Sequence, residues 1–360
     1  MNKGKGRKKG ISISGILFRI IVVVSAAALI LSYTAPYVNP TTFSIPMFFG
    51  LYFIPILFIN LFLLLIGLLR WKRYVFISFI ALLPSLFFAD LLYRTGKEEI
   101  GKEGNSYKIL TYNVGRFSAA KKGLPERLAL QEIEKFVISD NPDIVCLQEF
   151  RTSDTTAVSQ LFGGKYPYRS YHFFRGTNWF GNITLSKFPI TASGELTNSK
   201  STNLCIWSDI SLKSKTIRIY NCHLESLAIS FTSLVKKMSK NLEISTEVAG
   251  VHEKLRETAM KRSGQVDKLK EHISSCDKPL IVCGDFNDTP ISYTYRNLSN
   301  GLKDSFVEGG KGFSASYSIL WPLLRIDYIL LDKTMEADRN VIQRIPYSDH
   351  YPVSTYIYIK

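Results

Sequence analysis

The stretch PLIVCGDFNDTP, Pro279–Pro290, links fold and chemistry most directly in this 360-residue chain. Four consecutive apolar residues, Leu280–Cys283, predict a short strand that is buried on both faces. Gly284 then allows an unusual turn or a close approach of backbone, and the two-residue period of extended chain places Asp285 and Asn287 on one side. Gly, Asp and Asn are also favoured in plain turns. If the strand is correct, a carboxylate and an amide face one space at its end, where open α/β sheets keep their sites.

The chain around this strand alternates between predicted strands and helices. Strands are expected at Lys108–Tyr112, Ile144–Leu147, Asn182–Ser186, Leu204–Leu212, Thr216–Cys222, Arg325–Leu331 and Val353–Ile359. The short link at 213–215 indicates a hairpin. A helix is expected at Leu124–Ser139, its inner face formed by Leu128, Ile133, Phe136 and Val137, and the stretch 225–275 is helical in composition. Because strands outnumber helices, a mixed α/β sandwich is favoured over a purely parallel sheet.

The first ninety residues have a different composition. Three apolar stretches, at about 15–33, 45–69 and 74–92, are each long enough to cross roughly 30 Å of hydrocarbon. A cleaved signal peptide is disfavoured, because the first stretch is long, lacks a clear cleavage site and is followed by two more. We therefore expect a region with three transmembrane helices at 1–93, a charged linker at 94–106 and a second domain at 107–360.

The charge distribution predicts the topology. Basic residues precede the first span and recur at Arg70, Lys72 and Arg73, whereas the loop 34–42 has no charge. The positive-inside rule then places the N-terminus in the cytoplasm and the second domain outside an inner cell membrane. Residues 1–92 hold nine basic residues and one acidic residue, so they contribute +8 of the net +15. The remaining +7 is compatible with a phosphate-bearing partner but does not require one.

The five cysteines all lie after the third span. Cys146, Cys222 and Cys283 fall within predicted strands, so we expect them to be buried apolar residues. An odd number of cysteines without paired spacing argues against a disulfide framework, which is unusual for an exported domain.

A polar group ends each of several predicted strands, and the set reads as Asn113, Glu149, His223, Asp285, Asn287, Asp327, Ser348, Asp349 and His350. Each residue alone has an ordinary structural explanation as a turn residue, a strand-end charge or a satisfied histidine. Together, a carboxylate-rich set with two histidines and two asparagines is what hydrolysis of a phosphate ester needs. Hard oxygen ligands favour Mg²⁺ or Mn²⁺ over zinc. The sequence contains neither a glycine-rich phosphate loop nor a GxSxG nucleophile motif.

The motifs TYNV, LQEF, CHL, GDFN, RIDY and SDH, in this order, resemble the endonuclease/exonuclease/phosphatase superfamily. This superfamily includes deoxyribonuclease I-like nucleases, abasic-site endonucleases, neutral sphingomyelinases and inositol polyphosphate 5-phosphatases. The resemblance covers about Lys108–Lys360. It implies a four-layer α/β sandwich, in which two mixed β-sheets pack face to face with helices outside and the site lies at one end.

The resemblance also implies a metal site. It assigns Glu149 as the ligand of Mg²⁺ or Mn²⁺, with Asn113 beside it and Asp349 assisting. A bound cation neutralises an anionic substrate that would otherwise repel the attacking nucleophile.

The same resemblance assigns the catalytic roles. Asp285 is expected to position and deprotonate the attacking water, and Asn287 to hold that water or the phosphate. His350, paired with Asp327, and His223 are expected to bind the phosphoryl oxygens during in-line displacement. A histidine held by a carboxylate keeps one tautomer and one orientation.

These observations predict a membrane-anchored, metal-dependent phosphodiesterase, with an endonuclease or exonuclease as the first interpretation. The aromatic stretch 166–180, which holds Arg169 and Arg175, could follow a nucleic-acid backbone or form a half-buried strand. A phospholipid head group as substrate would explain the membrane region, and a scaffold without turnover is a further alternative. No obligate protein partner is inferred. The basic clusters of 225–275 could face anionic lipid or solvent, and they comprise Lys236, Lys237, Lys240, Lys261 and Arg262.

Overall fold

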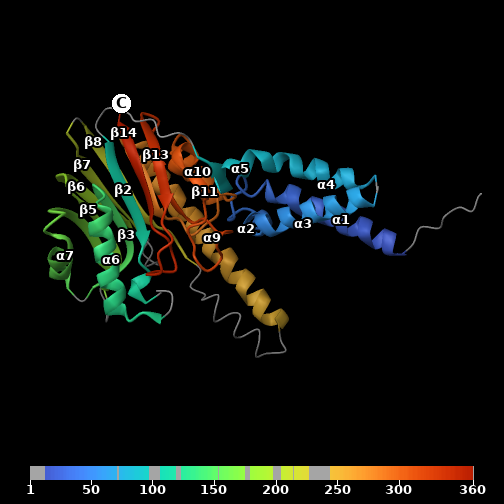
Figure 1. Ribbon diagram of the computed structural model, residues 1–360, viewed down its shortest axis with the longest axis horizontal. Helices are drawn as coiled ribbons and strands as arrows, with labels where there is room; N and C mark the ends of the chain where they lie inside the picture. The colour runs from blue at the N-terminus through green and yellow to red at the C-terminus, as the bar shows by residue number, and fades with distance from the viewer. Residues whose placement is uncertain are drawn as a thin grey trace, which may run out of the picture.

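The chain forms an elongated molecule with a β-sandwich at one end and a helical region at the other (Figure 1). The computed structural model describes residues 13–70, 73–96, 106–118, 123–152, 154–174, 179–197, 204–213, 215–226 and 244–359. The predicted basic cluster at Lys236, Lys237 and Lys240 lies outside these described residues, as do Arg175 and most of the linker.

Two six-stranded sheets build the sandwich. The first has the order β13(Met335–Ile342), β14(Val353–Ile359), β2(Ser106–Asn113), β3(Ile144–Thr152), β5(Trp179–Ser186) and β4(Tyr168–Phe174). The second has the order β10(Lys303–Asp304), β12(Asp327–Leu331), β9(Leu280–Asp285), β8(Thr216–His223), β7(Leu204–Ser211) and β6(Ile190–Thr197). All eight strands that the sequence predicts are present, and 166–180 contains the edge strand β4.

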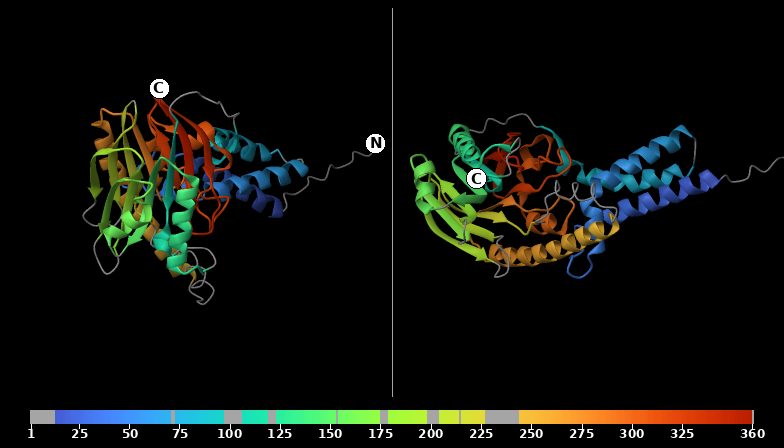
Figure 2. Two further views of the ribbon diagram at one scale, coloured as in Figure 1. Left: turned by 60° about the vertical axis from the view of Figure 1, so that its left-hand side comes forward. Right: turned by 90° about the horizontal axis from the view of Figure 1, so that it is seen from below.

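Helices cover the outer faces of both sheets. The first sheet carries α6(Glu126–Asp140) and α7(Thr155–Phe162), and the second carries α9(Ile244–Ser274) and α10(Tyr293–Ser299). Shorter elements complete the domain, namely η2(Gly115–Phe117), α11(Ser305–Gly309) and β11(Lys311–Phe313). Figure 2 shows the two sheets between these helices. The predicted four-layer α/β sandwich with two mixed sheets is confirmed.

Three apolar clusters separate the four layers. The central cluster lies between the sheets and contains Ile109, Cys146, Ile219, Cys283 and Ile329 among others. The other two clusters join each sheet to its outer helices. Cys146, Cys222 and Cys283 are fully buried within strands, as predicted. Strands buried on both faces explain why short apolar runs, rather than alternating patterns, marked them in the sequence.

Each sheet contains one parallel pair of strands among antiparallel neighbours. β2 runs parallel to β3, with Asn113 opposite Gln148, and β8 runs parallel to β9, with His223 opposite Asp285. The carboxyl ends of these four strands therefore place polar residues at one end of the sandwich. The predicted hairpin is also present, because β7 and β8 pair antiparallel.

Helix α6 corrects one detail of the sequence analysis. Its buried residues are Ala129, Ile133 and Val137, which follow each other at four-residue spacing. Leu128 was expected on the inner face but is 46% exposed, because it lies about 100° around the helix from Ala129. The helix ends at Asn141, which adopts the left-handed conformation that often caps helices.

The N-terminal region contains helices long and apolar enough to cross a membrane. Among the described residues, Ile13–Ser32 and Val75–Leu92 qualify singly, and Ile45–Leu51 with Phe53–Leu69 forms a pair bent by 70°. The elements are α1(Ile13–Ser32), α2(Ile45–Leu51), α3(Phe53–Leu69), α4(Val75–Leu82), η1(Leu83–Phe88) and α5(Ala89–Leu92). The second predicted span is thus a bent pair instead of one straight helix.

The helical region is attached directly to the sandwich. Strand β1(Tyr93–Thr95), at the start of the predicted linker, pairs antiparallel with β11. The long helix α9 extends from the sandwich to the helical region, as the right-hand view in Figure 2 shows. Of its predicted basic cluster, Lys261 is exposed, whereas Arg262 is only 4% exposed and bonds within the protein. Arg262 therefore faces neither lipid nor solvent.

Gly284 permits the close packing of β9 against β8, as its position in the sequence suggested. Its φ is +126°, and a Cβ atom there would lie 2.0 Å from the carbonyl oxygen of Cys222. Replacing Gly284 by alanine is expected to reduce the free energy of unfolding by about 3 kcal/mol, because the backbone must shift as well as adopt a strained φ. Urea denaturation followed by tryptophan fluorescence measures this loss.

Gly301→Ala is the matched control. Its φ of +85° is also unfavourable for alanine, but no atom lies within 4 Å of the added Cβ. We expect a loss of about 1 kcal/mol from backbone strain alone. Equal losses for the two variants would contradict the close approach at Gly284.

Candidate active site

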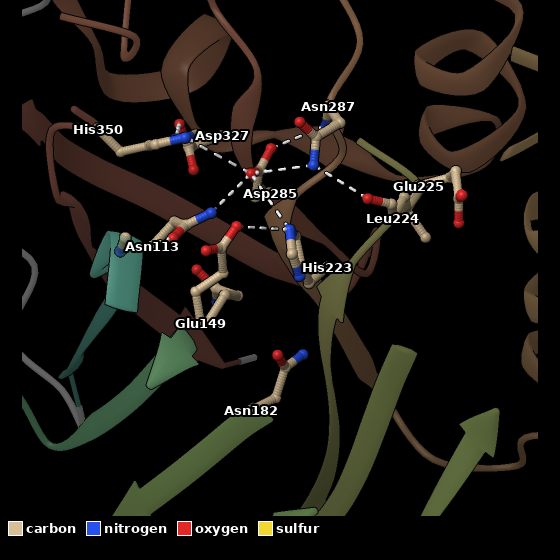
Figure 3. Close-up of polar contacts among 12 residues, drawn as sticks. Asn113, Glu149, Asn182, His223, Leu224, Glu225, Asp285, Asn287, Asp327 and His350 are labelled. Carbon is tan, nitrogen blue, oxygen red and sulfur yellow. Dashed lines mark hydrogen bonds and ion pairs between the residues drawn. The ribbon is translucent and has the colours of Figure 1, made fainter. Parts of the chain in front are cut away.

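Polar side chains from both sheets meet at the carboxyl ends of the two parallel strand pairs (Figure 3). β2 supplies Asn113, β8 supplies His223, β9 supplies Asp285, and β12 supplies Asp327. His350 comes from the loop before β14, and Asn287 from the turn after β9. Residues up to 237 positions apart in the chain are thereby brought into one cluster.

Asp285 lies at the centre of this cluster and is 1% exposed. Its Oδ2 accepts hydrogen bonds from Asn113 Nδ2 at 2.9 Å and from Asn287 Nδ2 at 3.1 Å. Its Oδ1 accepts one from the backbone N–H of Asn287 at 2.8 Å. Nε2 of His350 and Nε2 of His223 lie 3.7 and 3.9 Å from the same Oδ2. The buried carboxylate is therefore surrounded by donors on several sides.

Each histidine is held by a second carboxylate. Nδ1 of His350 lies 2.9 Å from Asp327 Oδ2, and Nε2 of His223 lies 3.3 Å from Glu149 Oε1. Ser316 holds Asp327 in place, because the Oγ of Ser316 accepts hydrogen bonds from the backbone N–H groups of Ile326 and Asp327. These contacts fix the orientation of both imidazole rings.

Glu149 reaches the site through an irregularity in its strand. The pairing of β3 with β5 shifts register between Leu147 and Phe150, and Glu149 has a φ of +51°. Such bulges redirect a side chain next to functional sites. Arg116 contacts the same carboxylate, with Nε 3.2 Å from Oε2, and its guanidinium lies 4.1 Å from the ring centre of Phe180.

Asn287 also has an unusual backbone, with a φ of +52°. Its side-chain amide bonds both Asp285 and the carbonyl oxygen of Leu224, at 3.1 and 3.0 Å. Uncommon conformations of this kind persist only where surrounding contacts hold them, and they concentrate at functional sites. The turn after β9 is thus a held conformation rather than a flexible loop.

The surroundings shift the pKa values of the acids in the cluster. Burial raises the pKa of Asp285 to about 6, although the charges of His350 and His223 oppose this. Burial would also raise the pKa of Glu149, but the hydrogen bond from His223 and the charges of His223 and Arg116 lower it to about 2. Burial raises the pKa of Asp349, and the nearby Glu149 adds to the increase.

The two histidines favour their protonated forms. Burial lowers the pKa of His350, but the charges of Asp327 and Asp285 outweigh burial and raise it well above its usual value. The pKa of His223 is likewise raised, because its bond to Glu149 outweighs burial. The raised pKa values of both histidines favour their imidazolium forms, and this arrangement favours binding of an anion.

A buried polar layer supports the site from below, and sequence analysis did not identify it. Gln148 Nε2 donates to Asn221 Oδ1 at 2.8 Å and to Thr111 Oγ1 at 2.9 Å. Asn182 Nδ2 donates to the carbonyl oxygen of Asn221 at 3.1 Å. These bonds connect the two sheets directly beneath the polar cluster. In the sequence, this layer could have been recognised from the polar residue that interrupts or borders the apolar run of each strand.

Arg116 was also missed by sequence analysis. It follows the TYNV motif by two residues, but only its positive φ of 54° and the folded chain bring it to Glu149. The nine polar residues that the sequence analysis named all lie at this end of the sandwich. Ser348 supports the cluster, since its Oγ donates to the Asn113 carbonyl at 2.8 Å.

Two groups of side chains could hold a cation. One is Asp285, Asp327 and His350, whose ligand atoms lie within 4.8 Å of one another. Their hydrogen bonds already occupy most of those atoms, although Asp327 Oδ1 is buried without a hydrogen-bond partner among the described residues. The other group is Glu149 with Asn113 and Asp349. Burial, and then the charge of Glu149, raise the pKa of Asp349, and a cation bound between the two carboxylates would relieve their repulsion.

Comparison with solved structures shows related folds. A functionally unknown conserved protein from Enterococcus faecalis matches with a TM-score of 0.52 and 14% identity over 70% of this chain and 100% of that chain. An endonuclease/exonuclease/phosphatase from Bacteroides vulgatus matches with a TM-score of 0.52 and 13% identity over 71% of this chain and 100% of that chain. At these identities the likeness shows the fold alone. The comparison with curated proteins found no match.

Family profiles match both parts of the chain. Residues 15–90 match a profile described as a domain of unknown function (DUF8431). Residues 110–350, well over half of the chain, match the profile described as the Endonuclease/Exonuclease/phosphatase family. This match includes β3, β8, β9, the end of β2 and every polar residue of the cluster. The chain belongs to the Endonuclease/Exonuclease/phosphatase family.

Proposed function

We propose that this protein is a membrane-anchored phosphodiesterase that uses a divalent cation and an activated water molecule. The observation that carries the proposal is the buried Asp285, which is flanked by two carboxylate-held histidines within 4 Å. A base beside two positively charged donors suits in-line attack of water on a phosphate ester. Nucleic acid is the first candidate substrate, and a phospholipid head group is the alternative.

Each residue has a distinct proposed role. Asp285 accepts a proton from the attacking water, and its pKa of about 6 leaves it mostly ionised at neutral pH. Asn287 orients that water or a phosphate oxygen. His350 and His223 donate hydrogen bonds to the phosphoryl oxygens as negative charge develops, and Asp327 keeps His350 in one orientation.

Glu149, Asn113 and Asp349 are the residues that we propose hold Mg²⁺ or Mn²⁺. When bound, the cation would neutralise charge on the phosphate. We favour this group over Asp285, Asp327 and His350, because the charges of Glu149 and Asp349 oppose each other and a cation between them would relieve this repulsion.

Hydrolysis tests the proposed reaction. The full chain in detergent should hydrolyse bis(4-nitrophenyl) phosphate with Mg²⁺ or Mn²⁺, and EDTA should abolish the reaction. His350→Ala and Glu149→Gln are expected to lower kcat by about 10²–10³, the usual cost of removing a central charge-stabilising group. His172→Ala, a partly exposed histidine on β4, is the matched control and should retain activity.

The same variants identify the substrate class. Nicking of plasmid DNA that both substitutions abolish supports a nuclease. Activity confined to phospholipid or sphingomyelin vesicles supports the lipid alternative. Equal rates for wild type and both variants on every substrate would reject the proposed reaction and favour a scaffold that retains the fold.

Binding of Mn²⁺ distinguishes the two candidate cation sites. Electron paramagnetic resonance titration of the full chain should show that Glu149→Gln weakens Mn²⁺ binding by more than about 100-fold, the upper range for losing a supporting residue of a metal site. Asp327→Asn should change the affinity far less, because Asp327 contacts His350 instead of the ion. The reverse order would place the cation at Asp285, Asp327 and His350.

We also propose that the N-terminus is cytoplasmic and the catalytic domain is outside an inner cell membrane. The loop 33–44 and the residues around Leu92 both contact the catalytic domain. The end of α3 and the start of α4, between which Arg70 and Arg73 fall in the sequence, lie at the opposite end of the helical region (Figure 1). This arrangement agrees with the positive-inside rule. Added protease should therefore cleave the catalytic domain in cells whose outer barrier has been removed. Cleavage only after lysis of the inner membrane would reverse the topology.

A further inference from the structure

The outer loop of the membrane region, Thr34–Phe43, contacts the catalytic domain through specific polar bonds. Asn39 Nδ2 donates to the hydroxyl oxygen of Tyr293 at 3.2 Å, and Asn39 Oδ1 accepts from Ser263 Oγ at 2.9 Å. Ser263 is on α9 and Tyr293 begins α10, so a single asparagine joins the loop to both helices. Arg296 of α10 also stacks on Tyr37 of the loop at 4.1 Å.

Apolar packing accompanies these bonds. Ile291 of the catalytic domain is 2% exposed and belongs to the same cluster as Ala26, Leu29 and Phe53 of the membrane helices. A Cβ at Gly50 would lie 2.4 Å from the Ile291 carbonyl oxygen, so the two backbones approach closely. The membrane region therefore packs on the segment that starts only four residues after Asn287.

Arg262 connects the contact between the membrane region and α9 with the turn after β9, which holds Asn287. It precedes Ser263 on α9, is 4% exposed, and lies 2.8 Å from the Asp288 carboxylate through its Nη1. Its Nε donates to the carbonyl oxygen of Glu225 at 3.0 Å. One buried guanidinium thus joins the residue after Asn287 to the residue after Leu224.

These two segments are the ones that hold Asn287 in its uncommon conformation. The Asn287 amide bonds the Leu224 carbonyl, and the Leu224 N–H donates to the Asp285 carbonyl at 3.0 Å. Tyr328 adds a bond from its hydroxyl to the Asp288 carbonyl at 2.8 Å. A shift of α9 or of residues 288–293 would therefore be transmitted to Asn287, and through it to Asp285.

We propose that the outer loop of the membrane region helps to hold the active site in its catalytic geometry, and that Asn39 is a positioning residue. By fixing Ser263 and Tyr293, Asn39 holds α9 and the 288–293 segment against the membrane helices. Arg262 then keeps the Asn287 turn in the geometry that aims Asp285. This proposal rests on the proposed hydrolysis, and it makes the membrane region more than an anchor.

A double-mutant cycle on the full chain in detergent tests the proposal. Asn39→Ala and Ser263→Ala should each lower kcat on bis(4-nitrophenyl) phosphate by about tenfold, since small misplacements of catalytic groups are costly, while KM changes little. The double variant should be no slower than Asn39→Ala alone, because that substitution already removes the bond to Ser263. A soluble substrate excludes any effect of presenting substrate at a membrane.

Two further variants separate positioning from loss of folding. Asn39→Asp keeps the oxygen that accepts from Ser263 and should retain most of the activity. Thr42→Ala changes an exposed side chain of the same loop and should leave kcat unchanged. Hydrogen–deuterium exchange provides a readout independent of catalysis, and the amides of residues 286–289 should exchange faster in Asn39→Ala than in wild type.

The outcomes are distinguishable. Faster exchange at 286–289 together with a lower kcat supports the proposal. Unchanged exchange, or faster exchange with wild-type kcat, overturns it, as would additive effects in the double variant. If wild type hydrolyses no phosphodiester under any condition, the proposed function itself fails, and this result is separate from the comparison among variants.

Discussion

The side chain of Asp285 is almost fully buried, and the surrounding structure must supply hydrogen-bond donors and positive charge to it. Isolating such a charge from water is costly unless donors and opposite charges surround it. Asn113 and Asn287 supply the donors, and His350 and His223 supply the positive charge. Because these residues come from both sheets, the site exists only when the two sheets pack face to face. The inter-sheet core and the active site therefore depend on each other.

The parallel strand pairs explain how the two sheets deliver these groups. In each sheet the two strands with aligned carboxyl ends are central, so their ends are covered by neighbours and remain out of water. The polar layer of Gln148, Asn221 and Asn182 then joins the sheets just beneath the cluster. Regular strands alone would not aim every side chain inward. The left-handed backbone at Glu149 and Asn287 makes the final adjustment, and surrounding hydrogen bonds hold both residues there.

The sequence predicted the buried strands and their polar ends well, because central strands are short apolar runs with a sharp change of polarity at the end. The edge strands β6 and β13 were not predicted. They carry charges such as Glu195, Asp338 and Arg339, which protect exposed edges and remove the apolar signal. Leu128 was assigned to the wrong face, since one residue of phase rotates a helix position by about 100°. Arg116 was missed because its role depends on a backbone conformation that composition does not reveal.

Contacts between the N-terminal helical region and the sandwich domain could not be predicted from either segment alone. A single flexible linker would let the two regions rotate freely relative to each other. Here the chain is fixed at two places. At the exit, the Leu92 carbonyl accepts from Ser314 N–H at 3.0 Å and β1 pairs with β11. At the loop, Asn39 binds α9 and α10. Two separate attachments prevent rotation about either one, so the fold itself sets the orientation of the polar cluster relative to the N-terminal helices.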